Sequence, residues 1–92
     1  MTVIHWAALA GRAEIVKLLA ARGADVNAVD NFGYTPLLYT ATVDFGDART
    51  ASALLDAGAD WRTADKGGKN AWAHSSNFPY IRTVLKKFGA GQ

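Results

Sequence analysis

Two histidines and eight carboxylates are the residues of this 92-residue chain whose chemistry first suggests catalysis or metal binding. His5 and His74 are far apart in the sequence, and neither belongs to an HxxH or HExxH pattern, so no zinc site is predicted. The absence of cysteine excludes thiolate metal sites, disulfides and a cysteine nucleophile. We therefore expect neither a metal nor a cofactor.

Three further motifs could support chemistry, and each has a simpler structural explanation. Two serines follow His74 directly, but consecutive residues of a helix do not face one another. Asp44 and Asp47 flank one loop and could form an acid–base pair, although a solvated loop with Asp47 heading a helix explains them better. Gly67-Gly68-Lys69 lacks the spacing of a phosphate-binding loop and fits a turn. The sequence thus predicts a noncatalytic protein.

The elements that would position these residues repeat along the chain. The residues that recur 35 positions later are Gly11, Gly23, Asp25, Asp30 and Gly33, whose counterparts are Gly46, Gly58, Asp60, Asp65 and Gly68. A repeat period of 20 to 50 residues is typical of stacked or solenoid architectures. Each unit contains a short helical segment, a longer one, and a turn rich in Asp, Asn and Gly.

Helical periodicity and capping residues place the helices within the first two units. Residues 2–10 form a short helix, and residues 13–22 a second one with Ile15, Leu18 and Leu19 on its apolar face. Gly23 suits the end of that helix. In the second unit, Thr35 is a good N-cap and Pro36 fits the first helical position, so helices are expected at 37–43 and 47–57.

The third unit is the most divergent. Pro79 stands at the expected start of the last helix, and its apolar stripe consists of Ile81, Val84, Leu85 and Phe88. Trp61 and Trp72 replace a turn valine and a short-helix leucine, so both are expected to be structural. The last residues, 90–92, should fray.

The chain resembles the ankyrin-repeat family over nearly its whole length. The residues that carry the resemblance are Ala7-Ala8, Gly11, Glu14 to Leu19, Gly23 to Ala28, Asp30, Gly33 and Thr35-Pro36-Leu37. The resemblance implies an all-α ankyrin-repeat solenoid of stacked helix-turn-helix units with hairpin-like connections. We expect a single domain, 1–92, with repeats at about 2–30 and 31–63 and a capping repeat at about 64–89.

The first unit departs from the family pattern in starting at Thr2-Val3-Ile4-His5 with no turn before it. Repeats need neighbours on both sides or a polar cap. We therefore expect apolar surface to remain open on unit one, whose internal residues include Ile4, Val16 and Leu19. This surface could support self-association, and the chain could be a fragment of a longer ankyrin-repeat protein.

The resemblance also implies a function. His5 corresponds to a family histidine that forms a hydrogen bond tying neighbouring turns together, and His74 should be partly buried. Family members commonly hold protein partners on a concave surface made by turn tips and short-helix ends. The partner-binding residues this implies are Asn31, Phe32, Tyr34, Val43, Asp44, Phe45 and Phe78. In the alternative interpretation, Phe45 and Phe78 fold back over their own loops.

Charge and targeting signals bear on location and on one further alternative. The net charge is +2, but residues 66–92 carry five basic and no acidic side chains. These are Lys66, Lys69, Arg82, Lys86 and Lys87, which could bind nucleic acid or an acidic surface weakly. With no signal peptide and no long apolar run in the sequence, a cytoplasmic location without membrane binding is expected.

Overall fold

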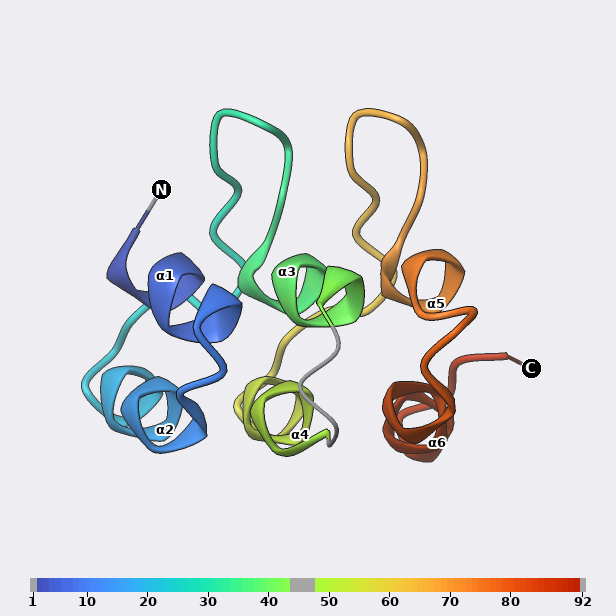
Figure 1. Cartoon of the computed structure of the whole chain (residues 1–92). Helices are drawn as coiled ribbons and strands as arrows, with labels where there is room; N and C mark the ends of the chain where they lie inside the picture. Colours follow the sequence, from blue (N-terminus) through green and yellow to red (C-terminus); the bar gives the residue numbers. More distant parts are fainter. Residues whose placement is uncertain (1, 44–47, 92) are drawn as a thin grey trace.

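The computed structural model describes residues 2–43 and 48–91, and these residues form three stacked helix pairs (Figure 1). The helices are α1 (Val3–Leu9), α2 (Ala13–Ala21), α3 (Pro36–Thr42), α4 (Arg49–Asp56), α5 (Ala71–His74) and α6 (Pro79–Lys87). Figure 1 shows α1, α3 and α5 in one row and α2, α4 and α6 in a second, with two long turns projecting beyond the first row. The described residues contain no β-strand, so the predicted all-α stack is confirmed.

Each short helix begins at a polar residue that caps it. The Thr35 side chain accepts a hydrogen bond from the backbone N–H of Leu38 at 3.2 Å, and Pro36 occupies the first turn, as predicted. Asn70 caps α5 in the same way, accepting from the N–H of Ala73 at 3.0 Å. Because the same position carries the cap in different units, the short helices start in equivalent register.

A glycine ends the first long helix, as the sequence predicts. Gly23 has φ +90°, a left-handed conformation that side chains other than glycine rarely adopt. This conformation lets the N–H of Ala24 donate to the carbonyl of Leu19 at 3.0 Å and so satisfy a free carbonyl of the last turn.

The core runs along the stack between the two rows of helices. Its largest fully buried apolar side chains are Leu37, Leu38, Leu54, Val16, Ile81 and Leu85, and many of the remaining core residues are alanines. Helix α1 packs against α3, and α2 packs against α4. The buried face of α4 combines two alanines, Ala51 and Ala53, with Thr50, Leu54 and Leu55.

The apolar face of α2 differs from the prediction. Val16 is fully buried and Leu19 is partly buried, whereas Ile15 and Leu18 remain 44% and 52% exposed. Their counterparts one unit later, Thr50 and Ala53, are only 3% and 4% exposed because the first unit covers them. The helical period is therefore correct, but α2 has two apolar faces and only one of them is covered.

The open apolar surface of unit one accordingly consists of residues other than the three named from the sequence. Ile4 and Val16 are buried, and Leu19 is partly buried. The exposed large apolar residues of unit one are Val3, Trp6, Leu9, Ile15 and Leu18, and the four most exposed of them, all except Leu9, are called here the N-terminal face.

The opposite end of the stack is closed by aromatic and basic side chains. The Arg82 guanidinium lies 4.0 Å from the ring centroid of Trp72 and donates a hydrogen bond to the Trp72 carbonyl at 2.7 Å. Trp61 packs against the core, and its indole N–H donates to the carbonyl of Phe88 at 3.2 Å. Both tryptophans pack as structural residues, as predicted. Of the expected stripe of α6, Ile81 and Leu85 are fully buried and Val84 is partly buried, whereas Phe88 lies just past the helix and remains 42% exposed.

The helices are all short. In the described part of the chain, none has the length and apolar character required to cross a lipid bilayer.

Candidate functional site

The tip of the first long turn is organised by one carboxylate. Asp30 Oδ1 accepts hydrogen bonds from the backbone N–H groups of Phe32 and Tyr34, at 2.9 and 3.0 Å, and Oδ2 accepts from the Tyr39 hydroxyl. Burial alone would raise the pKa of Asp30, but these hydrogen bonds outweigh it and hold the pKa below its ordinary value. Burial and the bond to Asp30 raise the pKa of Tyr39 to about 12.

The second long turn repeats this arrangement with one change of partner. Asp65 accepts from the N–H groups of Gly67 and Lys69, at 2.9 and 3.1 Å, and its Oδ2 lies 2.7 Å from Nε2 of His74. The hydrogen bond from His74 is the main reason that the pKa of Asp65 is lowered. Each tip is thus held by an aspartate tied to the ring of the following short helix.

A ladder of four rings connects the units behind these tips. Tyr34 lies between Tyr39 and His74, with centroid separations of 5.0 and 5.9 Å, and Tyr39 meets the edge of His5 at 5.8 Å. Tyr34 is therefore partly buried, so its ring supports the turn as well as forming part of its surface. The prediction that His74 is partly buried is confirmed.

His5 ties the first unit to the first turn. Its Nε2 lies 2.8 Å from the carbonyl oxygen of Tyr34, and its Nδ1 lies 3.2 Å from the backbone nitrogen of Thr2. A carbonyl only accepts and a backbone N–H only donates, so the ring carries its proton on Nε2. The predicted hydrogen bond between a unit and the neighbouring turn is confirmed.

Phe32 and Lys66 belong to the two turn tips, which contact each other through Lys66. Phe32 is 70% exposed, and its backbone N–H donates a hydrogen bond to Asp30. The Lys66 ammonium reaches from the second tip to the first and donates to the carbonyl of Asn31 at 2.8 Å. On its way the Lys66 stem passes Gly33, where an added Cβ would lie 2.8 Å from Lys66 Cγ. The Lys66 ammonium is thus bonded to the residue that precedes the exposed Phe32.

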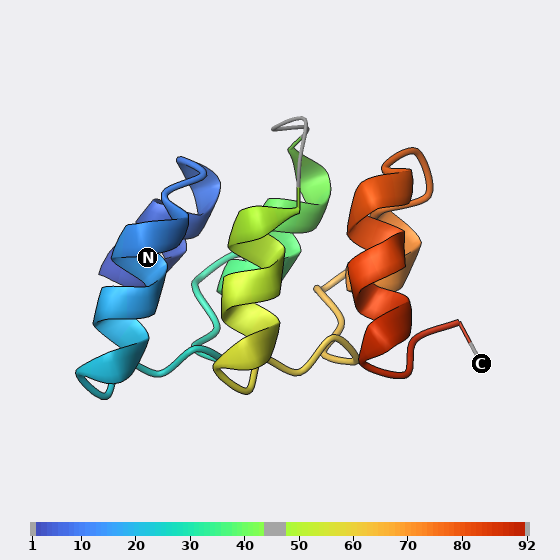
Figure 2. The same ribbon diagram turned by 90° about the horizontal axis from the view of Figure 1, so that it is seen from below.

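The remaining predicted site residues are not gathered at these tips. Val43 follows the last residue of α3 and Phe78 precedes the first residue of α6, at the opposite end of the helices from the turns (Figure 2). Phe78 is partly buried and packs near Tyr80 with a centroid separation of 6.2 Å, as expected for a ring folded onto its own loop. Asp44 and Phe45 lie outside the described residues, so their part in partner binding stays a prediction.

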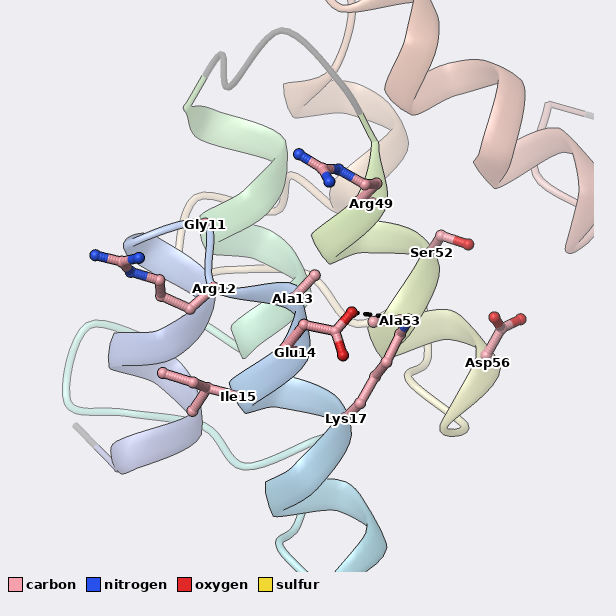
Figure 3. A pocket seen from close by; sticks show the side chains of 10 residues that line it. All are labelled: Gly11, Arg12, Ala13, Glu14, Ile15, Lys17, Arg49, Ser52, Ala53 and Asp56. Carbon is pink, nitrogen blue, oxygen red and sulfur yellow. Dashed lines mark hydrogen bonds and ion pairs between the residues drawn. The ribbon is translucent and has the colours of Figure 1, made fainter.

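A groove between α2 and α4, of about 570 Å³, was not predicted from the sequence (Figure 3). Its floor includes Ala13 and Ala53, and Glu14 and Lys17 form an ion pair of 3.5 Å on its α2 side. The signal in the sequence is the use of alanine at facing positions of the two long helices, which leaves space between their surfaces. Charges of both signs line the groove, without the buried, converging acid and base that catalysis needs.

The turns form a surface of fixed shape, and the aspartates and histidines described above stabilise that shape. No three His, Asp or Glu side chains come together as a metal site in residues 2–43 and 48–91. Asp30, Asp65, His5 and His74 all serve as partners for backbone groups or rings of the turns.

Comparison with known proteins agrees with this architecture. The family profile described as ankyrin repeats (3 copies) matches residues 1–87. Among similar curated proteins, chicken (Gallus gallus) inversin is 34% identical over 90 residues, which cover 94% of this chain and 8% of inversin. Mouse (Mus musculus) protein phosphatase 1 regulatory subunit 12A is 35% identical over 88 residues, covering 94% of this chain and 8% of the relative.

A third similar protein is human ankyrin repeat and SOCS box protein 6, 38% identical over 74 residues, covering 80% of this chain and 18% of the relative. The chain therefore spans less than a fifth of the length of each of these three proteins. The matching family profile, the repeated capping residues and the stacked helix pairs lead to one conclusion: this chain belongs to the ankyrin-repeat family.

Proposed function

We propose that this chain is a noncatalytic module that binds a protein partner through the concave surface formed by its turn tips and short helices. Ankyrin repeats generally mediate protein–protein interaction, and the fold itself is noncatalytic. The observation that carries the proposal is Phe32, a large apolar side chain left 70% exposed at the tip of an ordered turn. Aromatic residues are the commonest anchors of protein interfaces.

The rigidity of the turn supports this role. Asp30 fixes the backbone on both sides of Phe32, and His5 bonds the carbonyl of Tyr34, which ends the turn. Binding costs conformational entropy when a loop must be ordered, so a turn ordered in advance loses less of the interaction energy. Asn31 and Tyr34 flank the anchor, whereas Val43, Asp44, Phe45 and Phe78 would belong to a partner with a larger footprint.

Affinity capture tests the proposal. The chain and its Phe32→Ala variant are used to capture proteins from a nuclease-treated cell extract, and bound proteins are identified by mass spectrometry. The Phe32 side chain is 70% exposed, so the variant should fold normally. A protein retained by the parent and lost by Phe32→Ala is the expected result; identical capture by both forms would refute this site.

Self-association is a second candidate function, favoured by the exposed N-terminal face. Ile15 and Leu18 lie where Thr50 and Ala53 are covered in the next unit, so the same geometry offers a surface shaped for another helix pair. An apolar patch of this kind on a folded domain usually marks a contact surface. In a second copy the same face would be available, which permits a two-fold contact.

Sedimentation velocity over a hundredfold range of protein concentration distinguishes the two candidates. Self-association predicts that the sedimentation coefficient rises with concentration for the parent and for Phe32→Ala, but not for Leu18→Ser. Leu18→Ser is also the matched control for the capture experiment, because it changes an exposed apolar side chain away from the turns. A sedimentation coefficient that stays constant at every concentration would eliminate self-association.

A further inference from the structure

We infer that the turn tips bind an acidic peptide segment that carries a large apolar side chain. The inference rests on the proposed function and adds the chemistry of the partner. It follows from the position of the Lys66 ammonium, which is bonded to the residue that precedes the exposed Phe32, and from the hydrogen bonds that the carboxylates of the tips already accept.

Lys66 is held against the backbone of the residues that precede and follow Phe32. Its Nζ donates to the carbonyl of Asn31, the residue that precedes Phe32, at 2.8 Å. Its stem passes Gly33, the residue that follows Phe32, where an added Cβ would lie 2.8 Å from Lys66 Cγ. An ammonium group has three N–H donors, so two remain for a ligand. A carboxylate beside an apolar side chain matches this pair of groups.

The carboxylates of the tips keep their negative charge, but their oxygen atoms are engaged in hydrogen bonds within the molecule. Asp30 accepts three hydrogen bonds from its own turn and from Tyr39. Asp65 also accepts three, and its side chain is only 9% exposed. Lys66 and Lys69, in contrast, are exposed. An approaching ligand therefore meets two exposed ammonium groups, while each carboxylate already accepts three hydrogen bonds.

The positions of the other three basic residues of segment 66–92 favour a peptide over a nucleic acid as the ligand. Arg82 is stacked on Trp72, and Lys86 and Lys87 lie at the end of α6 in the second row of helices. Affinity for nucleic acid rises with the number of phosphates that are neutralised along a track. Two exposed lysines on one turn tip form no such track, but they suffice to select a short acidic segment with one apolar anchor.

Peptide display tests the inference. Random twelve-residue peptides displayed on phage are selected on the immobilised chain, and the binders are sequenced and then measured by fluorescence anisotropy. We expect enrichment of Asp and Glu next to Phe, Trp or Leu, with affinity that falls as salt rises. Lys66→Met keeps the stem that packs at Gly33 and removes the charge, so it should weaken binding about three- to tenfold.

Lys87→Met is the matched control, because it makes the same change in an exposed lysine on α6, and it should alter affinity less than about twofold. Selected peptides without an acidic bias, no selected peptide at all, or equal binding by Lys66→Met and the parent would each overturn the inference. A twelve-nucleotide single strand that binds more tightly than the acidic peptides, with the same dependence on Lys66, would replace the peptide with a phosphate ligand.

The failure of this inference can be told apart from failure of the proposed function. If Phe32→Ala loses its captured protein while Lys66→Met retains it, the concave surface is the binding site and the acidic preference is wrong. If neither substitution affects capture, both are wrong.

Discussion

Replacement of Gly33 by alanine tests how closely the two turn tips are packed. Gly33 has φ +81°, and an added Cβ would lie 2.8 Å from Lys66 Cγ and 3.1 Å from the Lys66 backbone nitrogen. The first distance is shorter than real side chains tolerate, and the second involves backbone that moves only with its whole turn. The substitution therefore combines backbone strain within one turn and steric overlap with the next.

Gly23→Ala separates these two effects. Gly23 has φ +90°, but no atom lies within 4 Å of an added Cβ, so alanine there adds strain without overlap. Left-handed backbone costs a non-glycine residue about 1–2 kcal/mol, of which about 0.4–1 kcal/mol is offset by the lower entropy of the unfolded chain. We expect Gly23→Ala to reduce the free energy of unfolding by about 1 kcal/mol. Overlap adds about 1–3 kcal/mol, so Gly33→Ala should cost about 2–4 kcal/mol.

Thermal and urea unfolding followed by circular dichroism measure the difference. In a domain of this size each kcal/mol lowers Tm by about 4–8 °C, so Gly33→Ala should melt at least about 4 °C below Gly23→Ala. In a Lys66→Ala background the overlap with Cγ is gone, and the cost of Gly33→Ala should fall toward that of Gly23→Ala. Equal costs for the two glycines, or a cost at Gly33 that Lys66→Ala leaves unchanged, would refute close packing of the tips.

Three further predictions concern the contacts between units. His5→Ala should lower the free energy of unfolding by about 3 kcal/mol in a urea titration, because it leaves a turn carbonyl unpaired and opens a cavity. The folded-state pKa of Asp65 is lowered, so the stability it contributes is present at neutral pH and is lost as pH falls below its ordinary value of 3.8. The urea midpoints of the parent and Asp65→Asn should therefore differ at pH 7, where the substitution removes the carboxylate that bonds His74, and should converge in acid. A difference that stays constant with pH would contradict this. Arg82→Lys should lower stability by about 1–2 kcal/mol in thermal unfolding, since an ammonium cannot both stack on Trp72 and keep the geometry of the bond to its carbonyl.

Features fixed by local sequence were predicted well. Thr35 and Pro36 specify the start of α3 through a side-chain acceptor and a fixed φ, and both effects depend on neighbours within three residues. Gly23 likewise ends α2 by its own backbone conformation. The hydrogen bond of His5 to the neighbouring turn joins residues that are far apart in the sequence. It was predicted only because the family resemblance aligns His5 with a histidine that makes this bond.

Features that depend on the stacking of units were not predicted from the pattern. Apolar residues at Ile15, Leu18 and Leu19 satisfy the helical period, but the period does not tell which side a neighbouring unit covers. The hydrogen bond between Asp30 and Tyr39 joins residues nine positions apart, on either side of a chain reversal. The sequence therefore indicated a turn at Asp30 but did not indicate that Tyr39 bonds it. The groove beside α2 arises from facing alanines on two helices, and its size depends on how far apart the helices pack.

The residues that hold the turns and the residues that face a ligand form separate sets. The Tyr39 hydroxyl donates to Asp30, and the His5 ring bonds the carbonyl of Tyr34. Changing Asp30, Tyr39 or His5 should therefore disturb the stack. Phe32 and Lys69 project from the tips, and their side chains can be exchanged with little effect on stability. Because the backbone of each tip is fixed by an aspartate and not by the ligand-facing residue, the chemistry of the surface can vary while its shape stays constant. Substitutions of the exposed residues at the tips should therefore change binding specificity while leaving the fold intact.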